Sequence, residues 1–186
     1  MNKAGIFIDG GHLNFHLVKK GWRIDFRKLF DYFIQKGFVP IGVFYYEGTL
    51  TEQSYSSRHP GDPFEKYLDA KKAKKAFFNF LRGLGFIVRT KPVHRLYDHD
   101  SQAYKFKCNF DVEMTIDMME MALTKEVDTF IICSGDGDLC RLVKYLKGRG
   151  KKVLVVAFKE CLNSALLTEA NETVLIEAIR GKIEYQ

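Results

Sequence analysis

The fold class follows most directly from the segment DTFIICSGDGDLC, at residues 128–140. Its first half is a short continuous apolar run, which is typical of a strand buried on both faces of a parallel sheet. Its second half is a turn rich in Gly and Asp that leads into a helical pattern over 139–147. The same order occurs near the start of the chain, in AGIFIDGG at 4–11. These segments predict two buried strands that each end in an acidic turn.

The rest of the chain alternates short apolar runs with helical patterns. Further strands are expected at 41–46, 86–90 and 153–158, and helices over 12–38 in two pieces, 64–84, 109–123 and 162–179, the last with one break. The polar stretch 48–61 is expected as a surface loop, and 98–101 as the tip of a hairpin. Apolar strands that alternate with helices predict an α/β fold, a three-layer α/β/α sandwich around a mainly parallel sheet. The length favours one domain over 1–186.

Composition narrows the class of protein further. The chain is 46% hydrophobic, with 16 Phe and 9 Tyr, which argues against a disordered or low-complexity protein. No apolar run approaches the ~20 residues of a membrane-spanning helix, and no leader pattern is recognised, so we expect a cytoplasmic protein without membrane contact. The four cysteines form no Cys-x-x-Cys pair and are expected as free thiols. A net charge of +6 suits a polyanionic partner without proving one.

Acidic residues follow the predicted strands. Open parallel sheets bind ligands beyond the carboxyl ends of their strands, near the point where the strand order reverses. Asp9 follows the first strand, Asp136 and Asp138 lie in the SGDGD turn, and Asp111 begins a helix. If the two strands are central neighbours, these four carboxylates converge. They would repel one another without a cation, and oxygen ligands without His or Cys select Mg²⁺ or Mn²⁺. One such ion, or two ~3.5–4 Å apart, can activate water against a phosphodiester, which is nuclease chemistry.

Each acid also has a purely structural explanation. Asp9 could simply form a turn with Gly10, Asp111 could be an N-cap, and Asp136 with Asp138 could complement a helix dipole. No shared structural need places all four at such positions, however. We therefore favour a metal site over these separate explanations.

Three blocks of the sequence resemble the NYN domain, including its LabA-like branch, within the PIN-like nuclease superfamily. They are FIDGGHLNF at 7–15, KCNFDVEMTIDMM at 107–119 and SGDGDLCRLVKYLKGRGKKVLVV at 134–156. The match covers nearly the whole chain in the right order. The resemblance implies a Rossmann-like, PIN-like sandwich and a metal-dependent ribonuclease site. Position by position, the acids that match the family's metal ligands and catalytic residues are Asp9, Asp111, Asp136 and Asp138.

The same resemblance suggests residues that bind the substrate: Asn14, Lys107, Ser134 and Ser164. The sequence also departs from the family pattern. His12 stands where the family has Asn, with Asn14 two residues later, and Cys108 replaces a usual Gly. These departures leave the metal ligands intact and concern the positioning of the substrate.

Other candidate sites have simpler explanations. His12 and His16 are four residues apart and share a helix face, which would suit a transition metal. Because no third His or Cys is near them in the sequence, we favour ordinary polar placement. The acids Glu113, Asp117 and Glu120 are expected on a solvated face, with Asp117 the strongest exception. Basic clusters at 71–75 and 141–152 are either phosphate contacts or solvated helix faces.

The sequence thus predicts a Mg²⁺- or Mn²⁺-dependent endoribonuclease whose partner is RNA, with a homodimer as the candidate assembly. The alternative is a catalytically silent RNA-binding or regulatory module of the same fold. Loss of a ligand acid would favour that alternative, and all four are present. A phosphatase pattern fits poorly, because it needs a second Asp two residues before or after Asp9, where Phe7 and Gly11 stand. A receiver pattern fits poorly as well, because it needs paired acids at the end of the first strand, where Gly10 and Gly11 stand.

Overall fold

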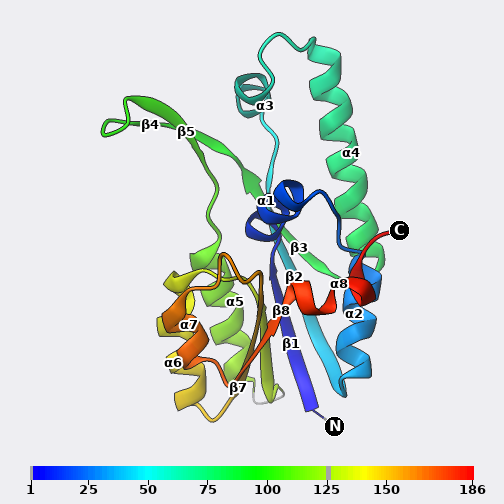
Figure 1. The fold of residues 1–186 in the computed structure, drawn as a ribbon, viewed down its shortest axis with the longest axis vertical. Coiled ribbons are helices and arrows are strands. Elements are labelled where there is room, and N and C mark those ends of the chain that lie inside the picture. Colours follow the sequence, from blue (N-terminus) through cyan, green and yellow to red (C-terminus); the bar gives the residue numbers. More distant parts are fainter. Residues whose placement is uncertain (1, 125–126) are drawn as a thin grey trace.

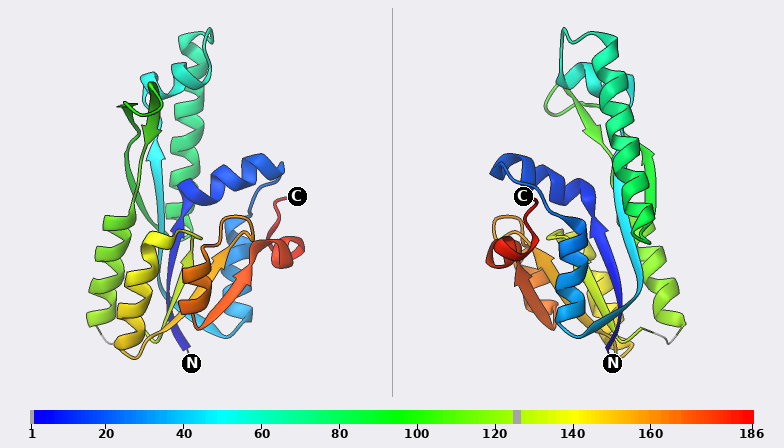
Figure 2. Two further views of the ribbon diagram at one scale, coloured as in Figure 1. Left: turned by 60° about the vertical axis from the view of Figure 1, so that its left-hand side comes forward. Right: turned by 90° about the vertical axis from the view of Figure 1, so that its right-hand side faces the viewer.

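The computed structural model describes residues 2–124 and 127–186. A six-stranded sheet lies at its centre, in the order β3-β2-β1-β6-β7-β8, and every neighbouring pair is parallel. The strands are β1 (Asn2–Asp9), β2 (Phe38–Thr49), β3 (Ile87–Pro92), β6 (Thr129–Cys133), β7 (Lys152–Ala157) and β8 (Glu172–Leu175). Helices cover both faces of this sheet (Figure 2), which confirms the predicted three-layer α/β/α sandwich.

Each face of the sheet has its own hydrophobic core. Successive strand residues point to opposite faces, so Ile6 and Ile8 enter one core and Phe7 the other. The helices over the first core are α1 (Gly10–Lys20), α2 (Phe26–Gln35), α4 (Phe64–Gly83) and α8 (Ile176–Ile183). Those over the second are α5 (Asp111–Leu123), α6 (Cys140–Gly148) and α7 (Ser164–Glu169). Burial on both faces explains the continuous apolar runs in β1, β6 and β7.

The strand order reverses beside β1. The chain builds outward from β1 through β2 to β3, and then returns to pair β6 with the other edge of β1. Ile8 of β1 lies opposite Cys133 of β6, so these two strands end side by side. The prediction that β1 and β6 are neighbouring strands is therefore confirmed. A ligand site is expected at this edge, where the carboxyl ends of parallel strands diverge into loops.

Part of the molecule extends beyond that edge. Figure 1 shows α3 (Glu52–Arg58), one end of α4 and an antiparallel hairpin rising past the carboxyl ends of the strands. The hairpin joins β4 (His94–Asp98) to β5 (Ala103–Lys107), in agreement with the predicted tip. Among the described helices, none is long and apolar enough to cross a bilayer.

Two predictions of secondary structure were wrong. The stretch 48–61 was expected as a loop, but it contains α3, which begins with a capping box between Thr51 and Ser54. The tail was expected to be helical with one break, but the break is β8, which extends the sheet beyond β7. A strand of four residues at a sheet edge is too short to show its own periodicity.

Candidate metal centre

Three predicted acids meet at the carboxyl end of the sheet. Asp111, Asp136 and Asp138 each have a carboxylate oxygen within 4.8 Å of the others. They come from two segments, the first turn of α5 and the turn after β6, which continues into a short 3₁₀ helix, η1 (Gly137–Leu139). Carboxylates are the ligands that Mg²⁺ and Mn²⁺ prefer, so the donor set fits the predicted metal.

Asp9 lies beside this group at the end of β1. The negative charges of Asp111, Asp136 and Glu47 all act on its carboxyl group. Burial is the main reason that its pKa rises to about 6, and these charges add to the rise. One hydrogen bond opposes it, because the backbone N–H of His12 donates to Oδ1 of Asp9 at 3.0 Å. The structure therefore brings all four predicted acids into one neighbourhood.

The pKa of Asp111 is also raised, first by burial and then by the charges of Asp136 and Asp138. The side-chain hydrogen bond from Asn109 and the charge of Lys107 partly offset this rise. Raised pKa values in neighbouring carboxyl groups show that the ionised forms are crowded and poorly solvated. A divalent cation would compensate this charge, so the electrostatics also fit a metal.

The structural explanations of these acids are partly correct as well. Asp9 is the N-cap of α1, and Asp136 is the N-cap of η1, accepting from the backbone N–H of Asp138 at 3.0 Å. Asp111 is instead the first residue of α5, after the N-cap Phe110. Capping uses one carboxylate oxygen of Asp9 and of Asp136, and the second oxygen of each can still serve as a ligand.

Glycines allow the acidic turns to pack closely. A Cβ on Gly135 would lie 2.5 Å from the backbone oxygen of Cys161, and one on Gly137 would lie 2.5 Å from the Asn163 side chain. A Cβ on Gly10 would lie 2.2 Å from the ring of Tyr45. Any larger residue would push the turns apart. Gly10, Gly135 and Gly137 therefore have a packing reason, independent of the metal.

Glu47 is an acidic residue near this centre that the sequence analysis missed. It follows Tyr46 near the end of β2, is only 7% exposed, and acts electrostatically on Asp9. Its carboxylate accepts hydrogen bonds from the Tyr45 hydroxyl at 2.7 Å and from Asn14 Nδ2 at 2.9 Å, and it pairs with Lys74. The rule that strand ends carry the ligand site could have found it, because the predicted strand stops at Tyr46.

The four residues assigned to substrate binding differ in burial and in their contacts. Ser134 is fully buried, and its hydroxyl accepts the backbone N–H of Asp136 at 3.3 Å, so it shapes the turn. Asn14 donates to Glu47 and Tyr45. Lys107 is exposed at the end of β5 and its charge acts on Asp111. Ser164 is exposed at the start of α7.

Two further acids of α5, Asp117 and Glu113, are paired with basic residues, and Glu120 is exposed. Asp117 is buried and accepts from Arg89 Nη2 at 2.8 Å and Nε at 3.1 Å, and from the Tyr46 hydroxyl at 2.8 Å. Glu113 accepts from Lys91 at 2.6 Å. Asp117, the expected exception to the solvated face, is indeed buried, because its position on α5 faces β2 and β3. It joins the helix to the sheet.

A groove adjoins the acidic centre. It has a volume of about 590 Å³ and passes Gly11, Glu47 and Cys108. Gly11 lies next to the centre, because a Cβ there would be 3.5 Å from Asp9 Oδ1. Its other lining residues include three basic and two aromatic side chains: Lys19, Arg58, Lys74, Phe15 and Phe106. A basic and aromatic groove beside clustered acids suits a chain of phosphates and bases.

Comparisons with known proteins agree with this architecture. The chain is 25% identical over 185 residues to "Low amplitude and bright protein LabA" of Synechococcus elongatus, covering 98% of this chain and 88% of that protein. It is 32% identical over 66 residues to an uncharacterized protein, MJ0482, of Methanocaldococcus jannaschii, covering 36% of this chain and 28% of that protein.

A solved structure supports the fold. The crystal structure of VPA0982, a protein of unknown function from Vibrio parahaemolyticus, superposes with a TM-score of 0.70 at 24% identity, covering 99% of this chain and 96% of that one. The NYN domain matches residues 3–177. The chain therefore belongs to the NYN domain family, within the PIN-like nuclease superfamily.

Proposed function

We propose that this protein is a Mg²⁺- or Mn²⁺-dependent endoribonuclease. The observation that carries the proposal is the convergence of Asp111, Asp136 and Asp138 to within 4.8 Å, beside Asp9, at the point where the strand order reverses. Family membership adds support, since the superfamily is one of nucleases. The fold alone would not decide the activity, because one fold hosts many functions.

In this proposal the aspartates coordinate the cation, and a neighbouring side chain orients one of their carboxylates. Asp9, Asp111, Asp136 and Asp138 are the proposed ligands. A divalent cation bound there would supply positive charge for the phosphodiester and for the attacking water. Asn109 donates from Nδ2 to Oδ2 of Asp111 and accepts the Asp111 backbone N–H at 2.7 Å, which fixes the orientation of that carboxylate.

The groove and the basic residues around it would bind RNA. Lys107 would attract the phosphates next to Asp111, and Lys19 and Arg58 would contact the backbone farther along. Phe15 is 58% exposed and offers a ring on which an unpaired base can stack. We propose single-stranded or unpaired RNA as the substrate, with Asn14, Ser134 and Ser164 in supporting roles. A cytoplasmic location, a homodimer and a single domain over 1–186 stay predictions.

The test is cleavage of labelled single-stranded and structured RNA with Mn²⁺, Mg²⁺ or EDTA. Wild-type protein should cleave with either metal and not in EDTA, and Asp136→Asn should lose the activity. Asp31→Asn is the matched control, because Asp31 is an exposed carboxylate on α2, away from the proposed centre, and this variant should cleave normally.

Two outcomes would contradict the proposal. Equal degradation by wild-type protein and Asp136→Asn would indicate a contaminating nuclease. Tight RNA binding without cleavage under any metal condition would favour the silent RNA-binding module.

A further inference from the structure

A second group of potential metal ligands lies next to the acidic centre. His12 and His16 are one turn apart on α1, and Cys161 lies in the loop that follows β7. One nitrogen of each histidine and the sulfur of Cys161 all lie within 4.8 Å of one another. Cys161 was not foreseen as a neighbour, because it is far away in the sequence. The structure thus supplies the third ligand whose absence had argued against a site here.

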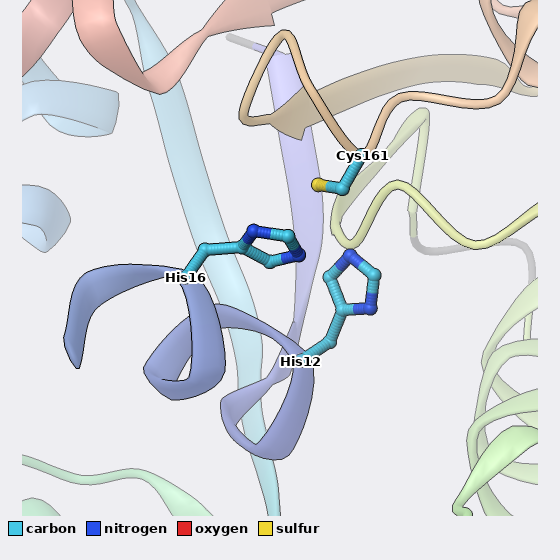
Figure 3. A group of neighbouring side chains, drawn as sticks. All are labelled: His12, His16 and Cys161. Atoms are coloured by element: carbon cyan, nitrogen blue, oxygen red, sulfur yellow. The ribbon is translucent and has the colours of Figure 1, made fainter. Parts of the chain in front are cut away.

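The side chains point toward a common space. Figure 3 shows that the two imidazole rings direct a nitrogen toward each other and toward the sulfur of Cys161. The ring centroids are 5.1 Å apart and tilted by 51°, so the rings are not stacked on each other. His12 Nε2 is buried and has no hydrogen-bond partner among the described residues. A buried nitrogen without a partner is unfavourable, and a bound cation would satisfy it.

The second ring nitrogen of His16, Nδ1, already has a carboxylate partner. Its Nδ1 lies 2.7 Å from Oε1 of Glu160, and Lys20 binds the other oxygen of that carboxylate at 3.2 Å. This contact holds the ring and leaves Nε2 free to act as a ligand. A carboxylate behind the imidazole is the usual arrangement for metal-bound histidines, where it orients the ring and raises its basicity.

We propose that His12, His16 and Cys161 form a site for Zn²⁺, separate from the proposed Mg²⁺ or Mn²⁺ centre. Two imidazoles and one thiolate are borderline and soft donors, which select Zn²⁺ over the hard cations that carboxylates prefer. Three protein ligands leave a fourth position for water. The Cys161 thiol now contacts the backbone oxygen of Phe158 at 3.5 Å, and it gives up its proton to solvent when the metal binds.

The site would connect two segments that flank the acidic turns. His12 follows the Asp9 turn, and its backbone N–H already binds the Asp9 carboxylate. The backbone of Cys161 packs directly against Gly135 in the turn that carries Asp136. Zn²⁺ would therefore tie the start of α1 to the loop after β7, and would hold the turn with Asp136 between them.

Cobalt provides a direct test, because Co²⁺ bound by a thiolate in a tetrahedral site has characteristic absorption bands. Metal-free, reduced protein is titrated with Co²⁺, and then with Zn²⁺ in the presence of excess Mg²⁺. We expect thiolate-to-cobalt and tetrahedral bands that saturate at one ion per chain. Zn²⁺ should abolish them, because it binds such sites more tightly than Co²⁺ does, and Mg²⁺ should not.

Variants assign the bands to these residues. Cys161→Ser should lose the thiolate band and Cys140→Ser, a matched cysteine control, should keep it. Glu160→Gln should keep the bands but weaken Co²⁺ binding by about 10–100-fold. Zn²⁺ should raise the unfolding temperature of wild type and Cys140→Ser, and not that of Cys161→Ser. Where Cys161→Ser does not fold by circular dichroism, His16→Gln replaces it, and it should lose the tetrahedral bands.

The proposal is overturned if wild-type protein gives no thiolate band, or if Cys161→Ser keeps it. Asp136→Asn separates this result from the nuclease proposal. That variant should lose RNA cleavage and retain the cobalt bands, because Asp136 belongs only to the acidic centre.

Discussion

Replacing Asp9 by Asn should stabilise the protein at neutral pH when no divalent metal is present. The pKa of Asp9 is raised from 3.8 to about 6, mainly by burial. Each unit of pKa corresponds to about 1.4 kcal/mol, so the ionised carboxylate destabilises the folded state by at most about 3 kcal/mol. Asn removes the charge and can still cap α1, because its side-chain oxygen accepts the same backbone hydrogen bond.

The pH dependence fixes the sign of this effect. Between pH 4 and pH 6 the folded protein binds more protons at Asp9 than the unfolded chain does. Stability is therefore lost as the pH rises through this window, and the loss is complete above about pH 6. The advantage of Asp9→Asn should be close to zero near pH 4 and largest at pH 7–8.

Urea unfolding in EDTA at pH 4 and pH 8, with Asp31→Asn as control, measures this effect. The free energy of unfolding of Asp9→Asn should exceed that of wild type by up to about 3 kcal/mol at pH 8. Adding Mn²⁺ at pH 8 should stabilise wild type more than the variant. A variant that is less stable than wild type at pH 8 in EDTA would contradict this prediction, since Asp9 would then be a favourable charge.

Three further predictions test other parts of the structure. Asp117→Asn weakens the paired contact with Arg89 and should lower the free energy of unfolding by about 1–3 kcal/mol, as measured by urea unfolding; an unchanged midpoint would contradict this. Gly135→Ala forces a Cβ against the Cys161 backbone and should destabilise by about 1–3 kcal/mol in thermal unfolding, and an unchanged unfolding temperature would contradict this. Lys107→Ala should weaken binding of single-stranded RNA and reduce the slope of log K against log salt by about 0.7, and an unchanged slope would exclude a phosphate contact.

The layers of the fold could be predicted because its strands are buried on both faces. Runs such as AGIFI at 4–8 and FIIC at 130–133 are apolar throughout, and few other structures require that pattern. Short elements, and elements stabilised by a local cap, were harder to predict from the sequence. The strand Glu172–Leu175 depends on its pairing with β7, and α3 depends on a cap between Thr51 and Ser54. Thr51, a residue type common at helix N-termini, was a sequence signal for α3, whereas no local sequence signal indicated that β8 pairs with β7.

The candidate acidic centre was predictable from the positions of acids at strand ends, once two strands were assumed to be neighbours. Its surroundings were not predictable in the same way. Asp117 pairs with Arg89, and Cys161 lies within 4.8 Å of the two histidines, although these residues are far apart along the chain. Such contacts depend on the tertiary structure, and local spacing carries no information about them.

The central claim is that carboxylates from distant segments hold one divalent metal centre. Anomalous diffraction from crystals grown with Mn²⁺ tests it most directly. We expect an anomalous peak among the carboxylates of Asp111, Asp136 and Asp138, next to Asp9, that is absent from Asp136→Asn crystals. A structure with these side chains turned away from one another and no peak between them would contradict it.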